Sequence, residues 1–454
     1  MVRQVNDMQT QIKQYTYPNG DLQKVQWAAL ERWEDLSFLT LPFAQTSLTC
    51  FSDIYRNFLV PTCPWLFGDM VMFHIPEDMA VPFPLETKKY GHVADQLTAA
   101  AAAMEEGVRL RQGKPVFRSE AVKAFWQELE RRDCLRVIRG KLPTTIFIPV
   151  GHAPGYLTQT ETDARLKVNA SFFIMDRFDC ATLYDHVGTI LGLCVKDGVV
   201  TNPPLYHREA LLVKKDGTVT VTVPDIRNMD MTIGASTFRH GRNCRIFTRP
   251  DHSRTPRCKG TKLVIVGCRV AAVSQAASVP IPASGFVMCL DGDCSIIPGS
   301  TVTYHGMEDV VFGIQVGNSI LIDGEKTTGF RSKFYNIRRL QPVPYPPSLY
   351  PMDFDNARAA RIALGADKDG KPMILWAEGA AKFGYQPGQM SCGASLKEMA
   401  EICADVGMVN AVNLDGGGSA QILLGNKRSL KISDRNRDTH DEAERPVPLG
   451  LMVR

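Results

Sequence analysis

The chain has 454 residues, more than one ordinary hydrophobic core holds, so its length predicts two or more domains. Hydrophobic residues make up 44% of it and charged residues 22%, as is usual in water-soluble globular proteins. The formal net charge of +4 is too small to indicate general binding to nucleic acids or membrane surfaces. We therefore expect no nucleic acid among its partners, and no apolar run is long enough to span a membrane.

The N-terminus lacks the charged and apolar pattern of a secretory signal. We therefore expect a cytoplasmic protein by default, or an exported one if a signal has been removed. The twelve cysteines are spread along the chain without a Cys-x-x-Cys pair or a zinc-finger spacing. This distribution predicts mostly buried, reduced thiols and not a zinc site.

Residues 1–140 differ from the rest of the chain in composition and in the spacing of apolar residues. Residues 93–112 are rich in alanine, and residues 119–132 place apolar side chains at helical spacing. A strand-like run at residues 70–75 lies between loops that contain proline. We predict a smaller mixed α/β region with at least two helices, of unknown role, that ends near residue 140.

Residues 144–454 consist mainly of short β-type runs, and Asp-Gly pairs separate several of them. The run at residues 211–223 turns at Asp216-Gly217, which is typical of a β-hairpin. Regular strands with such turns and few helices predict a mainly β domain with a few packing helices. Together with the mixed region at residues 1–140, this predicts an α+β fold for the whole chain.

Both ends of one helix in this domain are marked by their capping residues. Ser395 is a good N-cap residue and Glu398 follows three positions later, which makes a capping box. Apolar residues at helical spacing follow, and Gly407 is placed to end the helix in a left-handed conformation. We predict a helix between Ser395 and Gly407, followed by a strand at residues 410–414.

Residues 411–425, Ala-Val-Asn-Leu-Asp-Gly-Gly-Gly-Ser-Ala-Gln-Ile-Leu-Leu-Gly, are the sharpest chemical feature of the chain. Because Asn413 and Asp415 are two apart on a strand, their side chains are expected on one face. The three glycines allow a tight turn close to a ligand, and their N–H groups can form an anion-binding nest. A plain glycine-rich hairpin is the alternative, although three glycines cost conformational entropy and favour a functional reason.

This motif and the helix before it resemble the phosphodiester glycosidase family. The resemblance is carried by residues 393–400 and by residues 409–420, in which Asn-Leu-Asp-Gly-Gly-Gly-Ser is the most specific part. It covers about residues 144–454, and residues 1–140 lie outside it. Six further segments match family strands in the same order along the chain, at residues 168–173, 192–200, 241–250, 281–288, 361–367 and 444–453.

Two positions depart from the family pattern. The family has Asp-Gly-Arg after its central strand, whereas this chain has Glu378-Gly379-Ala380, which keeps a carboxylate and loses an arginine. Ile362 follows Arg361 where the family usually has threonine. Both changes affect expected contacts with the substrate phosphate, so they predict a different preferred group or a weaker activity.

The resemblance implies a hydrolase that cleaves a sugar-1-phosphodiester of the N-acetylglucosamine-1-phosphodiester type to free sugar and phosphomonoester. Such chemistry needs a partner for the diester's negative charge and carboxyl groups at the anomeric carbon. The first alternative is a non-catalytic carbohydrate-binding module in glycan or cell-envelope metabolism. A structural or assembly protein built on the same domain is a third interpretation.

Three carboxylates are the candidate catalytic groups: Asp415 first, then Glu378 and Glu444. Each can instead cap a turn or bind a structural cation. The acid and the base are not assigned, because that requires the separation and the environment of the carboxyl groups. No cofactor is expected, although Asp415 can also ligate a hard cation such as calcium.

Arginine suits the phosphodiester because its planar group binds two oxygens at once, and Arg361 and Arg445 are the candidates. Structural salt bridges are their alternative role. Asn413 and Asn169 are expected to hydrogen-bond sugar hydroxyls or an acetamido group, or else to serve a turn or a core network. Ser419 is either a nucleophile or, as we favour, a turn-stabilising hydroxyl. The remaining candidate substrate-binding residues are Gly416 and Gly417.

Overall fold

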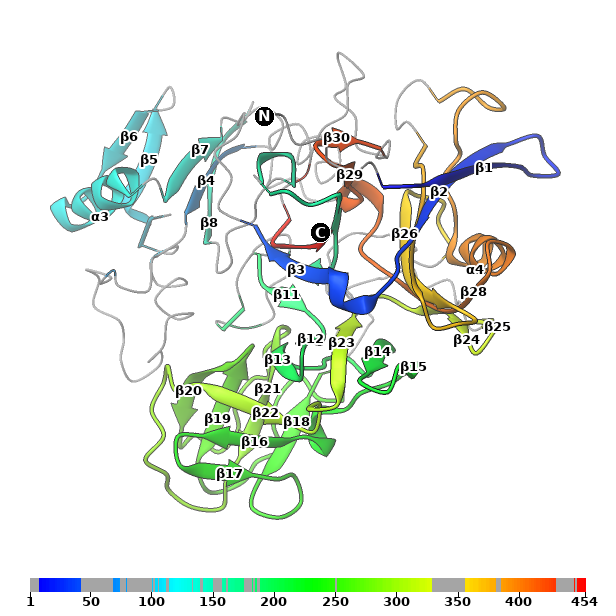
Figure 1. Cartoon of the computed structure of the whole chain (residues 1–454). Coiled ribbons are helices and arrows are strands. Elements are labelled where there is room, and N and C mark those ends of the chain that lie inside the picture. Colours follow the sequence, from blue (N-terminus) through cyan, green and yellow to red (C-terminus); the bar gives the residue numbers. More distant parts are fainter. Residues whose placement is uncertain are drawn as a thin grey trace.

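The fold of the protein is taken from a computed structural model, in which strands dominate (Figure 1). The prediction of a mainly β fold with few helices is therefore confirmed. The structure describes residues 8–41, 68–73, 79, 100, 103–104, 106–111, 114–132, 134–138, 142–149, 157–160, 162–174, 182, 184–185, 188–249, 251–328, 356–380, 385–429, 445 and 447–454.

The largest sheet has seven strands in the order β1-β2-β27-β26-β28-β24-β25, and neighbouring strands are antiparallel. Its central strand β26 pairs with β28, which ends at Asn413 and delivers the glycine-rich motif. The strands are β1 (Gln11–Thr16), β2 (Leu22–Ala29), β24 (Ser319–Ile322), β25 (Glu325–Lys326), β26 (Arg361–Asp367), β27 (Pro372–Ala377) and β28 (Met408–Asn413).

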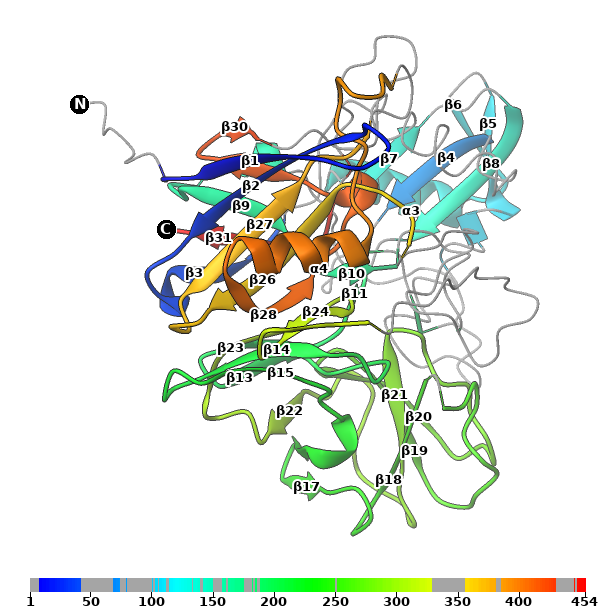
Figure 2. The same ribbon diagram turned by 90° about the vertical axis from the view of Figure 1, so that its right-hand side faces the viewer.

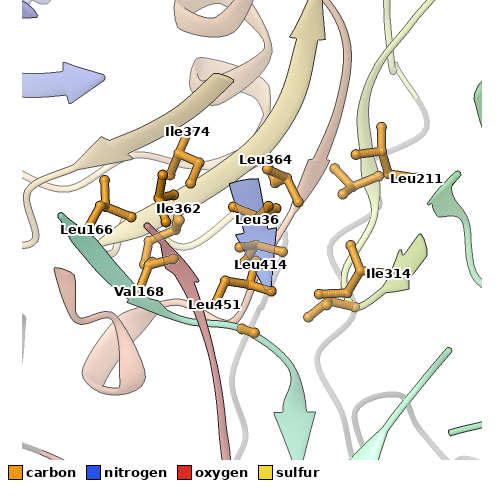
Figure 3. Packing of buried hydrophobic residues seen from close by; sticks show 14 of the residues in the cluster. Leu36, Leu166, Val168, Leu211, Ile314, Ile362, Leu364, Ile374, Leu414 and Leu451 are labelled. Carbon is orange, nitrogen blue, oxygen red and sulfur yellow. The ribbon is translucent and has the colours of Figure 1, made fainter. Parts of the chain in front are cut away.

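A second sheet has five strands in the order β3-β31-β9-β29-β30, again antiparallel. Its strands are β3 (Leu36–Thr40), β9 (Leu166–Asn169), β29 (Ile422–Leu424), β30 (Lys427–Arg428) and β31 (Leu449–Val453). Apolar side chains of this sheet and of the seven-stranded sheet share one buried core (Figure 3). Val168 and Leu451 meet Ile362 and Leu414 there, and full burial of each such side chain stabilises the fold by roughly 1.5–3 kcal/mol.

Residues 190–315 supply most of the other strands. A five-stranded sheet, β13-β12-β23-β14-β15, sends Leu211 and Ile314 into the same core as β26 (Figure 3). Its strands are β12 (Cys194–Lys196), β13 (Val199–Asn202), β14 (Ala210–Lys214), β15 (Val219–Thr222) and β23 (Val310–Gln315). The β14–β15 pair turns at Asp216 and Gly217, so the predicted hairpin is confirmed.

Smaller sheets pack beneath this five-stranded sheet on a second apolar core (Figure 2). A three-stranded sheet has the order β17-β16-β22, and a four-stranded sheet has the order β18-β21-β19-β20. The separate pair β10-β11 does not belong to this core, and its Leu191 and Phe172 pack in another small apolar cluster. The strands are β10 (Phe172–Phe173), β11 (Ile190–Leu191), β16 (Asp230–Ile233), β17 (Ser236–Phe238), β18 (Arg245–Thr248), β19 (Lys262–Val266), β20 (Arg269–Ser274), β21 (Gly285–Cys289) and β22 (Val302–His305).

The predicted helix at residues 119–132 is confirmed as α3 (Glu120–Arg131). The Ser119 hydroxyl caps it by accepting a hydrogen bond from the Val122 N–H at 3.3 Å. The described residues between 100 and 107 are also helical, and the chain continues as a strand from Val108. The strands of this region are β4 (Gly68–Phe73), β5 (Val108–Arg111), β6 (Lys114–Phe117), β7 (Leu135–Ile138) and β8 (Leu142–Pro149).

The predicted boundary near residue 140 placed residues 11–40 in a separate N-terminal region. In the structure these residues instead pair with strands of the C-terminal segment. Gln26 of β2 pairs with Trp376 of β27, and Leu36 of β3 pairs with Val453 of β31. These strands therefore complete both large sheets of the C-terminal segment. The sequence did not indicate this, because pairing between residues more than about 300 positions apart leaves no local pattern. For residues 68–138 a separate region stays a prediction.

The predicted helix between Ser395 and Gly407 is confirmed as α4 (Leu396–Asp405). The Glu398 N–H donates to the Ser395 hydroxyl at 3.3 Å, and the Ser395 N–H donates to the Glu398 carboxylate at 2.8 Å. Gly407 has φ of +94°, as its place at the helix end requires. The buried face of α4 covers one face of the seven-stranded sheet (Figure 2).

None of the described helices combines the length and the apolar character needed to cross a bilayer.

The packing of the N-terminal residues can be tested at Phe312, which is fully buried on β23. Its ring stacks on Trp33 at 5.7 Å and on Phe38 at 5.3 Å between centroids. We expect Phe312→Ala to lower the free energy of unfolding by about 3–5 kcal/mol, measured by urea denaturation. Val199→Ala, at a side chain that is 62% exposed, is the control and should change it by less than about 0.5 kcal/mol. A loss at Phe312 no larger than the control's would contradict this packing.

Candidate active site

Asp415 lies where β28 leaves the seven-stranded sheet. Asn413 still faces Ala363 across the β26–β28 pair, and the Leu414 N–H donates to the Ile362 carbonyl at 2.8 Å. The Gly417 N–H then donates to the Ala360 carbonyl at 2.8 Å. The start of β26 therefore runs beside the motif, and this brings the side chain of Arg361 to Asp415.

The Asp415 side chain is almost completely buried, with 7% exposure. Burial raises the pKa of its carboxyl group from 3.8 to about 7. The positive charge of Arg445, hydrogen bonds from Ser419 and the Gly416 N–H, and the charge of Arg361 lower this pKa, but by less than burial raises it. A carboxyl group that titrates near neutral pH can both give and take a proton, which suits general acid–base catalysis.

Arg361 is held in place by two backbone carbonyl groups. Its Nε donates to the Ala394 carbonyl at 3.0 Å, and its Nη2 donates to the Ala357 carbonyl at 2.7 Å. Both acceptors lie in segments that flank the site, just before β26 and just before the cap of α4. The guanidinium group is therefore fixed beside Asp415 by the strand and by the start of the helix.

Arg445 approaches the same carboxyl group from the segment that precedes β31. Its Nη1 donates to the Ser419 hydroxyl at 3.2 Å, and its side chain is 8% exposed. Its charge lowers the pKa of Asp415 more than any other neighbour does. The structure thus brings together four residues that the sequence selected: Asp415, Arg361, Arg445 and Ser419.

The Ser419 hydroxyl lies between the acid and a guanidinium group. It accepts from Arg445 and hydrogen-bonds to Asp415, and it is 1% exposed. These contacts favour the predicted role of Ser419 as a hydroxyl that stabilises the turn. Attack by Ser419 as a nucleophile stays a weaker hypothesis.

The geometry of the turn explains two of the three glycines. A Cβ atom on Gly416 would lie 2.7 Å from the Ala360 carbonyl oxygen, closer than real contacts allow. Gly417 has a backbone φ of +58°, a value that residues other than glycine adopt less readily. Glycine at position 416 therefore permits the close approach to Ala360, and glycine at position 417 suits the left-handed backbone. Contact of either glycine with a ligand stays a prediction.

The two asparagines have different environments. The Asn169 amide donates to the Asp415 carbonyl at 2.8 Å and accepts from the Gln421 N–H at 2.8 Å, so it bonds the backbone of the motif. The Asn413 side chain is 2% exposed, and its Oδ1 has no hydrogen-bond partner in the described part of the chain. Leaving such an acceptor unpaired costs roughly 1–3 kcal/mol, so Asn413 is a place where a ligand or a water is expected.

Glu378 follows the last residue of β27 and is half-buried. Its carboxylate accepts from the Ser391 hydroxyl at 2.8 Å, in the segment that also presents the Ala394 carbonyl to Arg361. Participation of Glu378 in the site stays a prediction. Glu444 lies outside the described residues.

The two departures from the family pattern have different consequences. The Ile362 side chain is fully buried in the core shared with Leu414 and Ile374 (Figure 3), so it packs among apolar side chains. Ala380 is half-buried and follows Glu378 after the end of β27. An effect of Ala380 on phosphate contacts stays a prediction.

Sequence reasoning missed Gln421, which is 7% exposed. Its Nε2 donates to the Arg445 carbonyl at 2.6 Å, and its Oε1 has no partner in the described part of the chain. The available signal was its position directly after the glycine-rich turn, where the following strand begins. Among the described residues no group of three or more His, Cys, Asp or Glu side chains is arranged to hold a metal. Calcium at Asp415 stays an open alternative.

Comparison with known families supports the resemblance over part of the chain. Residues 283–454 match the model of the family described as phosphodiester glycosidase. The resemblance to that family is therefore confirmed for this segment, which contains Arg361, Asp415 and Arg445.

Three similar proteins are named N-acetylglucosamine-1-phosphodiester alpha-N-acetylglucosaminidase. Those of Mus musculus and Homo sapiens are 35% identical to this chain over 100 residues, and that of Bos taurus is 36% identical over the same length. The match spans 22% of this chain and only 18% of each relative.

Solved structures give weaker likenesses. A hypothetical protein from Synechocystis has a TM-score of 0.42 and 15% identity, covering 98% of this chain and 62% of its own. A zebrafish N-acetylglucosamine-1-phosphodiester alpha-N-acetylglucosaminidase catalytic domain, auto-inhibited by its pro-peptide, has a TM-score of 0.36 and 12% identity, covering 98% of this chain and 82% of its own. These values are too low to carry an argument about the fold.

The buried carboxyl of Asp415 predicts a pH-dependent stability. Because its pKa is raised from 3.8 to about 7 in the folded state, the folded protein binds a proton that the unfolded chain releases. Stability from this group is therefore present below pH 3.8 and is lost as the pH rises to about 7. We expect Asp415→Asn to gain stability relative to the original chain by about 1.4 kcal/mol per pH unit within this window.

The measurement is urea unfolding of both proteins at pH 5 and pH 8. Because all other titrating groups are shared, their effects cancel in the difference between the two proteins. A difference that is the same at both pH values would show that Asp415 does not titrate in this range.

Proposed function

We propose that the protein is a glycosidase-type hydrolase that cleaves a sugar-1-phosphodiester to free sugar and phosphomonoester. The observation that carries this proposal is the placement of one buried carboxyl group beside two guanidinium groups at Asp415, Arg361 and Arg445. The family match over residues 283–454 supports the reaction class. The names of the mammalian relatives support N-acetylglucosamine-1-phosphodiester as the substrate type.

The charges of this group suit a phosphodiester. A phosphodiester carries one negative charge, which needs a partner when it leaves water. Two guanidinium charges act on one carboxylate, so the three side chains together carry one positive charge when all are ionised. Arginine also offers two parallel N–H donors to a pair of phosphate oxygens. Arg361 and Arg445 are therefore the proposed binding groups for the diester.

Asp415 is the proposed catalytic carboxyl group. The reaction breaks the bond between the anomeric carbon and the phosphate oxygen, and the oxygen of water forms the new bond to that carbon. One proton must leave the attacking water, and the released phosphate takes up a proton according to its own pKa. A carboxyl group with a pKa of about 7 can serve either transfer near neutral pH. A second carboxyl group, from Glu378 or Glu444, would decide which transfer Asp415 serves.

The buried oxygen of Asn413 supports a sugar as part of the ligand. An amide oxygen that lacks a partner accepts a hydrogen bond from a hydroxyl or from an acetamido N–H. Ser171, one residue after the Ala170 carbonyl that accepts from the Asp415 N–H, also has a buried hydroxyl without a partner in the described residues. Both atoms are suited to the hydroxyl groups of a saccharide.

The second candidate function is a carbohydrate-binding module without catalysis. The replacement of the family's arginine by Ala380 favours it, because one expected contact to phosphate is absent. The two functions differ in what they require of Asp415. An enzyme needs a carboxyl group that exchanges a proton, whereas a module needs only a polar group of the same shape.

The test is incubation with uridine diphosphate N-acetylglucosamine and with p-nitrophenyl sugar phosphodiesters, followed by measurement of the free sugar. We expect release by the original chain and a loss of about 100- to 10,000-fold in Asp415→Asn. Asp291→Asn, at a side chain that is 90% exposed, is the matched control and should retain full activity. Binding without release, unchanged in Asp415→Asn, would favour the module. No release from any of these substrates by the folded protein would count against the enzyme.

A further inference from the structure

The loop from Asp415 to Gln421 is closed by two consecutive residues, Asn169 at the end of β9 and Ala170 directly after it. The Asp415 N–H donates to the Ala170 carbonyl at 3.0 Å, and its carbonyl accepts from the Asn169 amide at 2.8 Å. At the other end, the Gln421 N–H donates to the Asn169 amide oxygen at 2.8 Å, and its carbonyl accepts from the Asn169 N–H at 3.2 Å. Both ends of the loop are thus held twice.

The residue that closes the loop is itself firmly placed. Asn169 is the last residue of β9, which pairs with β29 on one side and with β31 on the other. Its side chain is 1% exposed, and both its amide oxygen and its amide N–H are engaged with the loop backbone. A loop with three consecutive glycines has many accessible conformations, so a fixed bridge across its ends removes most of them.

Gln421 extends the same network to the guanidinium group. Its Nε2 donates to the Arg445 carbonyl at 2.6 Å, and Arg445 donates in turn to the Ser419 hydroxyl inside the loop at 3.2 Å. The side-chain amides of Asn169 and Gln421 therefore fix the backbone that carries the carboxyl group and one of its two cationic partners. In the described contacts both amides bond only backbone carbonyl and N–H groups.

We infer that Asn169 and Gln421 are positioning residues of the site, Asn169 for Asp415 and Gln421 for Arg445. This inference rests on the proposed function and changes the role of Asn169 from sugar contact to control of the loop. Asn169 sets the shape of the loop that carries the carboxyl group. Gln421 sets the backbone from which the guanidinium group projects.

The primary test is Asn169→Ala in the full chain, with steady-state kinetics across pH. We expect kcat to fall roughly 10- to 100-fold, as for a misplaced reacting group, with little change in KM. Because the loosened loop admits water to Asp415, the midpoint of the pH profile attributed to this group should fall toward that of an ordinary aspartate. A variant that is less stable but keeps both kcat and the pH profile would overturn the inference.

Gln421→Met is the second variant, because it keeps the length of the side chain and removes its donor. If Arg445 is released, its positive charge lies farther from Asp415 and favours the ionised carboxylate less. The midpoint of the pH profile attributed to Asp415 should therefore rise. The two variants are thus expected to move the midpoint in opposite directions. A shift in the same direction, or no shift in either, would contradict the separate roles.

Asn410→Ala is the matched control. Asn410 lies within β28, five residues before Asp415, is 5% exposed and accepts from the Asp323 N–H at 2.9 Å. We expect a loss of thermal stability similar to that of Asn169→Ala, with kcat and pH profile unchanged. A kinetic effect of Asn410→Ala equal to that of Asn169→Ala would mean that general destabilisation explains both.

A readout without substrate separates this inference from the proposed function. The titration of Asp415 can be followed by ¹³C NMR of aspartate-labelled protein, with Asp415→Asn identifying the signal. If the original chain releases no sugar but Asn169→Ala and Gln421→Met shift this titration in opposite directions, the positioning roles stand while the hydrolase proposal fails. An unshifted titration in both folded variants would overturn the positioning roles, whatever the activity.

Discussion

The burial of one carboxyl group beside two guanidinium groups is the interaction on which the candidate site depends. Moving an aspartate out of water disfavours its charged form, and positive neighbours only partly offset this effect. The balance leaves a group that titrates near neutral pH, which an exposed aspartate does not. The chemistry proposed for the protein follows from this balance and not from the mere presence of an acid.

The fold supplies this balance by joining parts of the chain that are distant in sequence. Arg361 begins the central strand β26, Asp415 lies two residues after the end of the neighbouring β28, and Arg445 precedes the last strand of the other sheet. Each charged group is attached to an element that is fixed by sheet pairing or by backbone hydrogen bonds. The site therefore forms only when both large sheets are complete, which ties its geometry to the stability of the whole core.

Local chemistry made part of this arrangement predictable. The helix after Ser395 could be predicted because its cap depends on residues three positions apart, and the hairpin at Asp216-Gly217 because its turn depends on two. The candidate residues Asp415 and Arg361 were found through a motif of adjacent residues and a resemblance. Their closeness to one another follows from the β26–β28 register.

Other features could not be predicted because their partners are remote or are backbone atoms. Nothing in residues 22–40 indicates that they pair with strands near the C-terminus, since any apolar strand offers similar edges. The role of Asn169 in bridging the two ends of the loop could not be predicted from the sequence for a related reason. Its partners are a carbonyl and an N–H group, which every residue carries, so the sequence does not single them out.

The pairing of β3 with β31 has a consequence for how the protein is made. Leu36 meets Val453, so a strand that leaves the ribosome early must wait for roughly 400 further residues before its neighbour exists. At about 5–20 residues per second, that interval lasts from tens of seconds to more than a minute. During this time the edge later covered by β31 is open to other strands, so chaperones that shield nascent chains should matter more for this protein than for one with nearest-neighbour pairing.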